Sequence, residues 1–305
     1  MYACGFARRV LAGFVVITLL GAASVATPCV AGEWPGAKAA WHGFDQYRFT
    51  VDGHRAYVVV PHKAARGNPW VWRARFPDYH ADMDIMLLGK GFHIGYVDVA
   101  GMYGCPKAVE LGDKFYALLT TEHNLAKKPV LEGVSRGGLF VYNWAVKNLE
   151  HVACIYCDTP VMDICSWPGG KGKGVGSPAA WKECLAAYGL TEQQAEAYKK
   201  NPIDTAVEIV KAGIPILHIV SDSDRVVPPA ENTDLARACV PEKLQRKFRV
   251  MRVRQGTPAS QGHHFKHPDP VAVVNFIVRQ AIHTKVDSSR HPTREHSSPT
   301  AENRG

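Results

Sequence analysis

Short apolar runs rich in valine and isoleucine recur between residues 69 and 282, and longer amphipathic stretches separate them. A run of this kind predicts a buried parallel strand, whereas apolar residues three and four positions apart predict a helix. Their alternation predicts an α/β fold with a mostly parallel sheet and helices on both faces. The predicted strands of this series lie near Val71 and at residues 95–99, 130–132, 152–157, 214–220 and 248–253.

Outside this series the pattern predicts one hairpin and several helices. Strands at residues 47–51 and 56–60 flank Asp52-Gly53, a pair that favours a tight turn. Pro270 suits the first turn of the last helix, because a helix leaves that N–H without a partner. Helices are predicted at residues 139–146, 179–188, 192–199 and 270–282.

Residues 158–213 form a stretch that is too long for a simple crossover between strands. It begins with a Gly- and Lys-rich run that does not match the phosphate-binding pattern, because Lys173 is followed by glycine rather than by Ser or Thr. The stretch follows a predicted parallel strand, and the carboxyl ends of such strands form the functional edge of a sheet. We therefore interpret it as a lid insertion over the active site.

The two ends of the chain differ from the middle. Arg8 and Arg9 precede an apolar stretch at residues 10–26, and small residues then permit cleavage after Ala26 or Ala31. This pattern is typical of a signal peptide, with an uncleaved membrane anchor as the alternative. It predicts a secreted protein, periplasmic or extracellular, with no stable membrane insertion after cleavage. The expected organisation is a signal peptide at residues 1–31, an α/β domain at 32–283 and a disordered tail at 284–305.

Gly133-Val134-Ser135-Arg136-Gly137 has the G-x-S-x-G spacing of a nucleophile elbow. The motif lies between a predicted strand and a predicted helix, so it would hold the serine on a sharp turn. Glycines at 133 and 137 leave room, because side chains there would strike the neighbouring strand and helix. Ser135 would then lie near a helix N-terminus, whose free N–H groups can stabilise an oxyanion. The sequence predicts Ser135 as a nucleophile, and a chance match in a strand-to-helix turn is the alternative.

A nucleophilic serine needs a histidine base and an acid that orients the base. After an elbow of this type the acid precedes the histidine along the chain. The predicted strand 214–220 is followed by Asp222 and Asp224, of which Asp224 is preferred as the acid and Asp222 is the alternative. In the loop before the last helix, His263 directly follows a glycine and is preferred over His264 as the base.

Other residues are candidates for binding the substrate and its oxyanion. The backbone N–H of Arg136 is predicted as one oxyanion donor, and Ala74 or Arg75 is expected to supply the second. The guanidinium groups of Arg73, Arg75 and Arg136 could bind a substrate carboxylate, with ordinary surface ion pairs as the alternative. Trp167 is a candidate stacking surface for a sugar or an aromatic group, or else an anchor of the lid to the core.

Charge and cysteine content narrow the possible partners. The net charge is +8, yet the chain has no basic helix or Lys/Arg-rich run, so nucleic acid is not indicated. A mildly basic exported enzyme would suit an acidic glycan. Six cysteines lie beyond the signal peptide, and Cys165 with Cys184 is the favoured disulfide because these two bracket one insertion. Cys154 and Cys157 are interpreted as core residues, because they lie in a predicted strand rather than at a helix start.

These features resemble those of α/β-hydrolases of the serine-esterase and prolyl-oligopeptidase-like group over nearly all of residues 37–282. More narrowly, the chain is similar to a family of exported bacterial α/β-hydrolases. The histidine segment of that family resembles G-H-H-P-H, whereas this chain has Gly262-His263-His264-Phe265-Lys266-His267, which keeps His263 but departs at the later histidine. The matching stretches are residues 41–44, 69–76, 135–139, 142–145, 166–170 and 231–233.

The resemblance implies an α/β-hydrolase fold and a secreted serine hydrolase that acts on a small-molecule or glycan ester. The Ser135-Arg136 pair also resembles the elbow of glucuronoyl esterases, whose arginine assists the oxyanion, and this favours a carbohydrate-linked ester. The expected reaction is acyl transfer to water, and it requires no metal and no organic cofactor. A metal site at His263, His264 and His267 is disfavoured, because no carboxylate or cysteine lies at a supporting spacing. The alternatives are a serine peptidase of prolyl-oligopeptidase type and an inactive hydrolase fold that binds carbohydrate.

Overall fold

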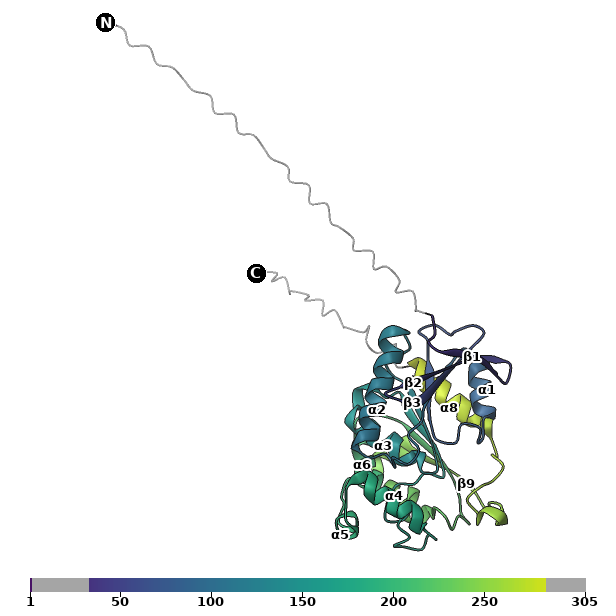
Figure 1. The fold of residues 1–305 in the computed structure, drawn as a ribbon, viewed down its shortest axis with the longest axis vertical. Helices are drawn as coiled ribbons and strands as arrows, with labels where there is room; N and C mark the ends of the chain where they lie inside the picture. The colour runs from purple at the N-terminus through teal and green to yellow at the C-terminus, as the bar shows by residue number, and fades with distance from the viewer. Residues whose placement is uncertain (2–32, 284–305) are drawn as a thin grey trace, which may run out of the picture. The chain divides into compact units, whose positions relative to one another are not determined.

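The computed structural model describes residues 33–283 together with Met1, and the remaining residues are drawn in grey in Figure 1. The predicted signal peptide, its membrane-anchor alternative and the predicted tail therefore lie outside the described residues. Within residues 33–283 no helix is long and apolar enough to cross a membrane.

Nine strands form one sheet in the order β1-β2-β3-β5-β4-β6-β7-β8-β9. The strands from β5 to β9 in this order are parallel to one another, whereas β1, β2 and β3 pair antiparallel and β3 pairs antiparallel with β5. The prediction of a mostly parallel sheet is therefore confirmed. The strands are β1 (Ala37–Trp41), β2 (Phe44–Val51), β3 (His54–Val60), β4 (Trp70–Ala74), β5 (His93–Val97), β6 (Val130–Val134), β7 (Cys154–Asp158), β8 (Ile216–Ser221) and β9 (Phe248–Val253).

Helices cover both faces of this sheet, as the sequence pattern predicts (Figure 1). They are α1 (Asp82–Gly89), α2 (Pro106–Ala117), α3 (Gly137–Lys147), α4 (Pro178–Tyr188), α5 (Glu192–Glu196), α6 (Pro202–Lys211), α7 (Thr233–Ala238) and α8 (Pro270–His283). Short helical turns occur at Leu118–Glu122, Leu149–His151, Pro229–Glu231, Glu242–Lys247 and Pro258–Ser260.

Two layers of apolar side chains hold the helices to the sheet. On one face, residues of α2, α3 and α6 such as Phe115, Phe140 and Ile209 pack in one buried cluster with strand residues. On the other face, α1 and α8 pack against each other and contribute a second cluster. The strands between the two layers are buried along their whole length, which explains why they appear in the sequence as continuous apolar runs.

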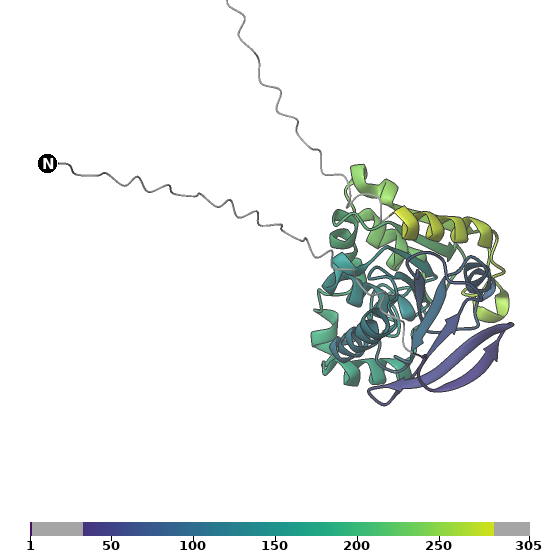
Figure 2. The same cartoon turned by 90° about the horizontal axis from the view of Figure 1, so that it is seen from above.

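Some boundaries differ from the predicted ones. The helix expected at residues 192–199 ends at Glu196, and the strand expected from residue 214 begins at Ile216. Strand β1 has no counterpart among the predicted elements, because an edge strand of mostly exposed residues carries no apolar run. Figure 2 shows this N-terminal, purple part of the sheet as one of its edges.

The predicted insertion at residues 158–213 divides into two parts. Its last helix, α6, packs against α3 and buries Ile209 in the main core, so α6 belongs to the layer that covers the sheet. The part before α6 builds a third apolar cluster, which contains Trp181 and Cys184 of α4 and packs against Leu139 of α3. The inserted segment is therefore shorter than the sequence suggests.

The Gly- and Lys-rich run at the start of the insertion is tied to the rest of the protein. Glu231 accepts hydrogen bonds from the hydroxyl of Ser166 and from the backbone N–H of Lys173. A single carboxylate thus bonds to Ser166 and to Lys173, seven positions apart in this run.

The disulfide expected between Cys165 and Cys184 is not formed. Both are free thiols, as are the other four cysteines of residues 33–283. The Cys165 thiol donates to the carbonyl oxygen of Ala195, and Cys184 is packed inside the third apolar cluster. Cys154 and Cys157 are fully buried in β7, as their assignment to the core predicts, and burial raises the pKa of the Cys154 thiol.

Candidate active site

Ser135 occupies a sharp turn between the end of β6 and the start of α3. Its φ is +50°, a left-handed conformation that is uncommon for a residue with a side chain. Two neighbouring strands contact this turn. The Ser135 N–H donates to the carbonyl oxygen of Asp158 at 2.9 Å. On the β4 side, a Cβ atom at Gly137 would collide with the carbonyl oxygen of Ala74. These contacts have the geometry that the elbow motif predicts.

His263 reaches Ser135 from the loop between β9 and α8. Its Nε2 lies 3.0 Å from the Ser135 Oγ, and its Nδ1 lies 2.7 Å from the Oδ2 of Asp224. The other carboxylate oxygen of Asp224 accepts the backbone N–H groups of Val226 and Val227, each at 2.8 Å, so the acid has a fixed orientation. The structure thus brings together the serine, histidine and aspartate that the sequence singles out, with hydrogen bonds along the whole series.

The two alternative residues take no part in the hydrogen bonds of Ser135, His263 and Asp224, although the ring centre of His264 lies 5.2 Å from that of His263. The Asp222 carboxylate points to the Arg252 guanidinium, 2.5 Å away and partly exposed to solvent. The His264 ring stacks obliquely near Tyr79, and none of its ring nitrogens has a partner in the Ser135 network. The geometry therefore agrees with the preference for Asp224 over Asp222 as the acid and for His263 over His264 as the base.

A second histidine–aspartate pair lies next to the first and was not anticipated from the sequence. Asp158, the last residue of β7, is buried, and its Oδ2 lies 2.5 Å from the Nδ1 of His80. The His80 Nε2 is 2.8 Å from the carbonyl oxygen of Phe265, two residues beyond His263. Burial by itself lowers the pKa of His80, but the hydrogen bond and charge of Asp158 outweigh burial, so the pKa is raised.

Arg73 does not bind substrate, contrary to the sequence-based expectation. Its side chain is 0% exposed and forms ion pairs with Asp84 at 2.6 Å and Glu132 at 2.9 Å. The same guanidinium donates to the carbonyl oxygens of Phe76 and Tyr79. A charge on a strand that is buried on both faces must be paired inside the protein. Arg73 therefore holds the loop after β4 against the sheet.

That loop lies against the elbow, where the second oxyanion donor is expected. Arg75 and Phe76 both have left-handed backbone conformations, with φ of +68° and +44°, which turn the chain out of β4. Arg136 caps the N-terminus of α3, where backbone N–H groups lack partners within the helix. These positions are compatible with donors from Arg136 and from Ala74 or Arg75, and the choice between the last two remains a prediction.

The side chain of Arg136 is surrounded by three aromatic rings. Its guanidinium carbon lies 5.7 Å from the ring centre of Phe76 and 5.9 Å from each of Tyr103 and Trp167. Trp167 belongs to the inserted segment and is partly buried against the third apolar cluster. The insertion therefore brings Trp167 beside the residue that follows the nucleophile, whereas its contact with substrate remains a prediction.

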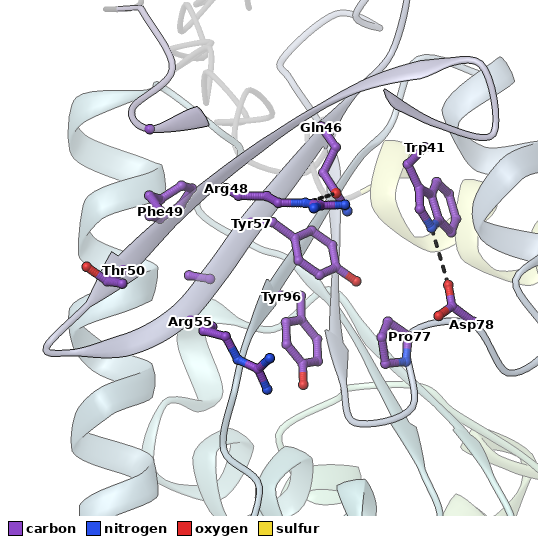
Figure 3. A pocket seen from close by; sticks show the side chains of 12 residues that line it. Trp41, Gln46, Arg48, Phe49, Thr50, Arg55, Tyr57, Pro77, Asp78 and Tyr96 are labelled. Atoms are coloured by element: carbon purple, nitrogen blue, oxygen red, sulfur yellow. Dashed lines mark hydrogen bonds between the residues drawn. The ribbon is translucent and has the colours of Figure 1, made fainter. Parts of the chain in front are cut away.

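A cavity of about 780 Å³ lies on the side of the sheet formed by β2 and β3 (Figure 3). None of its lining residues belongs to the Ser135 network, so it is a separate hollow rather than the space over the serine. Tyr57 and Tyr96 stack in it with ring centres 4.9 Å apart. Pro77 and Asp78, from the loop held by Arg73, also line this cavity.

Comparison with known proteins supports the fold. No protein-family model matches the sequence, and a search of curated proteins found no match. Among solved structures, a puromycin hydrolase superposes with a TM-score of 0.55 at 19% identity, over 74% of this chain and 37% of its own. Est1E from Butyrivibrio proteoclasticus and an S-formylglutathione hydrolase from Agrobacterium tumefaciens each superpose with a TM-score of 0.52 at 14% identity, over 80% of this chain and 98% of their own.

These similarities, with the sheet order and the elbow, define an α/β-hydrolase fold. The chain spans little more than a third of the puromycin hydrolase but nearly the full length of Est1E. Its solved structural neighbours include both peptidases and esterases.

Proposed function

We propose that this protein is a secreted serine hydrolase that cleaves carboxylic esters. The observation that carries the proposal is the continuous series of hydrogen bonds from the Ser135 hydroxyl through His263 to Asp224. A hydroxyl so placed can be deprotonated as it attacks, and the resulting imidazolium is stabilised by the carboxylate.

The reaction proceeds in two steps. The Ser135 Oγ attacks the ester carbonyl carbon while His263 Nε2 takes the hydroxyl proton, and the tetrahedral intermediate collapses as His263 returns that proton to the leaving alcohol. Water, deprotonated by the same nitrogen, then attacks the acyl-enzyme carbonyl, and the intermediate collapses as His263 returns the proton to the Ser135 Oγ, which releases the acid and the free serine. The backbone donors near Arg136 and the loop after β4 stabilise the oxyanion in both steps.

An ester linked to a carbohydrate is the proposed substrate class. Its support is the resemblance of Ser135-Arg136 to the elbow of glucuronoyl esterases, together with the position of Trp167 beside Arg136. Trp167 offers a flat apolar ring of the kind on which sugars stack. Secretion is proposed from the N-terminal pattern, and sequencing the N-terminus of the exported protein would test it by locating the cleavage after Ala26 or Ala31.

A serine peptidase is the second candidate, and one specific observation favours it. The solved neighbours include an acylaminoacyl peptidase from Pyrococcus horikoshii, with a TM-score of 0.55 at 13% identity. The third hypothesis, an inactive fold that binds carbohydrate, is disfavoured because Ser135 and Asp224 both lie within hydrogen-bond distance of His263.

The test is an activity screen of the secreted protein against p-nitrophenyl acetate, acetylated and methyl-esterified glycans, and peptide amides. We expect turnover of esters without turnover of amides. Turnover of amides would select the peptidase instead, and glycan binding without turnover would select the inactive fold.

The control for this screen is Ser135→Ala, which removes the attacking oxygen without adding volume to the elbow. It should reduce turnover on the order of a thousandfold or more, while the far-ultraviolet circular dichroism and melting temperature stay close to those of the parent. Undiminished turnover in the folded variant would end the serine-hydrolase hypothesis.

A further inference from the structure

Two arginines near the nucleophile share one aromatic ring. The guanidinium carbon of Arg75 lies 4.8 Å from the ring centre of Phe76, and that of Arg136 lies 5.7 Å from it. Arg75 comes from the loop after β4, and Arg136 directly follows Ser135. Both side chains are partly buried. Two cations thus lie near one ring, and one of them is the residue next to the nucleophile.

The described part of the chain balances the charges of these two arginines only in part. No carboxylate of residues 33–283 lies within salt-bridge distance of Arg136, and the only one within that distance of Arg75 is Asp98, at 3.6 Å. Asp98 is already bonded to Arg55 at 2.8 Å. The Nε atoms of Arg75 and Arg136 are buried and lack a hydrogen-bond partner among the described residues.

Arg73 shows how the same fold treats a guanidinium that has a structural role. Two carboxylates and two carbonyl oxygens surround it. Arg75 and Arg136, by contrast, are like charges near the same ring, and burial followed by the charge of Arg136 lowers the pKa of Arg75. Buried donors without partners cost stability, so their presence beside a nucleophile indicates a ligand that supplies the acceptors.

We propose that Arg75 and Arg136 together bind a carboxylate that the ester substrate carries near its scissile bond. This inference rests on the proposed esterase function and specifies its substrate class. A carboxylate is planar and accepts the parallel N–H groups of a guanidinium, and the flat walls of Phe76, Tyr103 and Trp167 suit a planar group. Tyr103 is buried and Trp167 is partly buried, so these two rings limit the access of water, which strengthens the ion pair.

The position of the pair also limits where the carboxylate lies in the substrate. Arg136 is the neighbour of Ser135, so the carboxylate must be separated from the ester carbonyl by only a few bonds. Asp98, 3.6 Å from Arg75, also accepts the hydroxyl of Tyr96, so the separate cavity that Tyr96 lines in Figure 3 begins near Arg75.

The test compares two esters with the same leaving group, mono-p-nitrophenyl succinate and p-nitrophenyl butyrate. The measured quantity is the ratio of kcat/KM for the anionic ester to kcat/KM for the neutral one. Using a ratio cancels any change that a substitution makes to the oxyanion donors. We expect a ratio above one for the parent protein, and a decrease of about tenfold to a hundredfold in each of Arg75→Gln and Arg136→Gln, as lost charge-assisted hydrogen bonds predict.

The matched control is Arg252→Gln. It removes the same charge from an arginine that pairs with Asp222 and Asp234 and is 43% exposed. Its ratio should stay within about twofold of the parent value, because exposed charges act weakly at a distance.

A parent ratio at or below one, or a decrease confined to one of the two variants, would overturn the shared carboxylate site. An equal loss for both esters in Arg136→Gln would do the same, because it would show that the side chain acts on the oxyanion. If the variants do not fold, inhibition of the parent protein provides the test. Monomethyl succinate should inhibit ester hydrolysis with an inhibition constant at least about tenfold lower than that of dimethyl succinate. If the parent protein cleaves neither ester nor any other probe, the esterase proposal fails instead.

Discussion

Two histidine–aspartate pairs lie side by side at the carboxyl edge of the parallel strands, and their short contacts are nearly the same. The distance is 2.7 Å between His263 and Asp224 and 2.5 Å between His80 and Asp158. What differs is the group that faces the second ring nitrogen. For His263 this group is the Ser135 hydroxyl, whereas for His80 it is the carbonyl oxygen of Phe265.

That difference determines the protonation of each ring. A hydroxyl can donate, so a neutral imidazole can accept from Ser135 while its other nitrogen donates to Asp224. A carbonyl oxygen can only accept, as can a carboxylate, so His80 satisfies both of its partners only when both nitrogens carry hydrogen. His263 is therefore arranged as a base, and His80 as a cationic link between β7 and the loop that carries His263.

The first prediction separates the two acids and has the largest expected effect. Asp224→Asn should reduce kcat on the order of a thousandfold or more, because the amide favours the wrong tautomer of His263. Asp158→Asn should cost about tenfold, because it weakens a support of the histidine loop without touching the proton path. The measurement is kcat for the best ester of the screen, with folding checked by circular dichroism.

The matched controls for this pair are the neighbours that the sequence could not exclude. Asp222→Asn and His264→Ala should each stay within a few-fold of the parent kcat, because both side chains lie outside the Ser135 network. Equal losses in Asp158→Asn and Asp224→Asn would refute the assignment of the triad acid.

The contrast between the two pairs also shows what could be predicted from the sequence. Ser135, Asp224 and His263 could be found because each is marked by local pattern: an elbow motif, an acidic loop after a buried strand, and a Gly-His step before the last helix. The strands of the parallel series were found for the same reason, since burial on both faces leaves continuous apolar runs.

His80 and Arg73 could not be assigned in this way. The contact of His80 with Asp158 joins residues 78 positions apart, and no motif surrounds His80. Arg73 lies in a strand that was predicted, but its role depends on Glu132, 59 positions away. Burial on both faces of β4 is a signal that could have found it, because a charge within a buried strand requires partners inside the core.

The second prediction tests whether His80 is cationic. His80→Ala should lower kcat about tenfold at neutral pH, because the loop carrying His263 loses its link to β7. Since the pKa of His80 is raised, the link is complete below the ordinary histidine value of about 6.5 and is lost as pH rises through the raised value. The ratio of parent to variant kcat should therefore fall toward one as pH rises above about 6.5 and through the raised pKa of His80. The charged and titratable groups around His80 are Asp158, Arg73, Tyr79, His264 and His267.

A purely structural role for His80 would give a different result. In that case His80→Ala would have a lower melting temperature, and its kcat would be lower than that of the parent by the same factor at every pH. His80→Lys keeps a cation near Asp158 and serves as the conservative variant, so it should recover part of the kcat lost in His80→Ala. A parent-to-variant ratio that does not change with pH would contradict the cationic link.

The third prediction, with the smallest expected effect, concerns the role of Trp167 in selecting the substrate. Trp167 lies beside Arg136 and is only partly buried, whereas Trp181 of the same insertion is 7% exposed inside the third apolar cluster. Trp167→Ala should therefore change the relative kcat/KM of different esters about three- to tenfold and lower the melting temperature by only a few degrees. Trp181→Ala is the matched control and should do the reverse, because it leaves a cavity in a packed cluster. A large loss of melting temperature in Trp167→Ala with an unchanged order of substrates would make Trp167 a core anchor, and substrate selection would then have to depend on Arg75, Arg136 and the loop after β4.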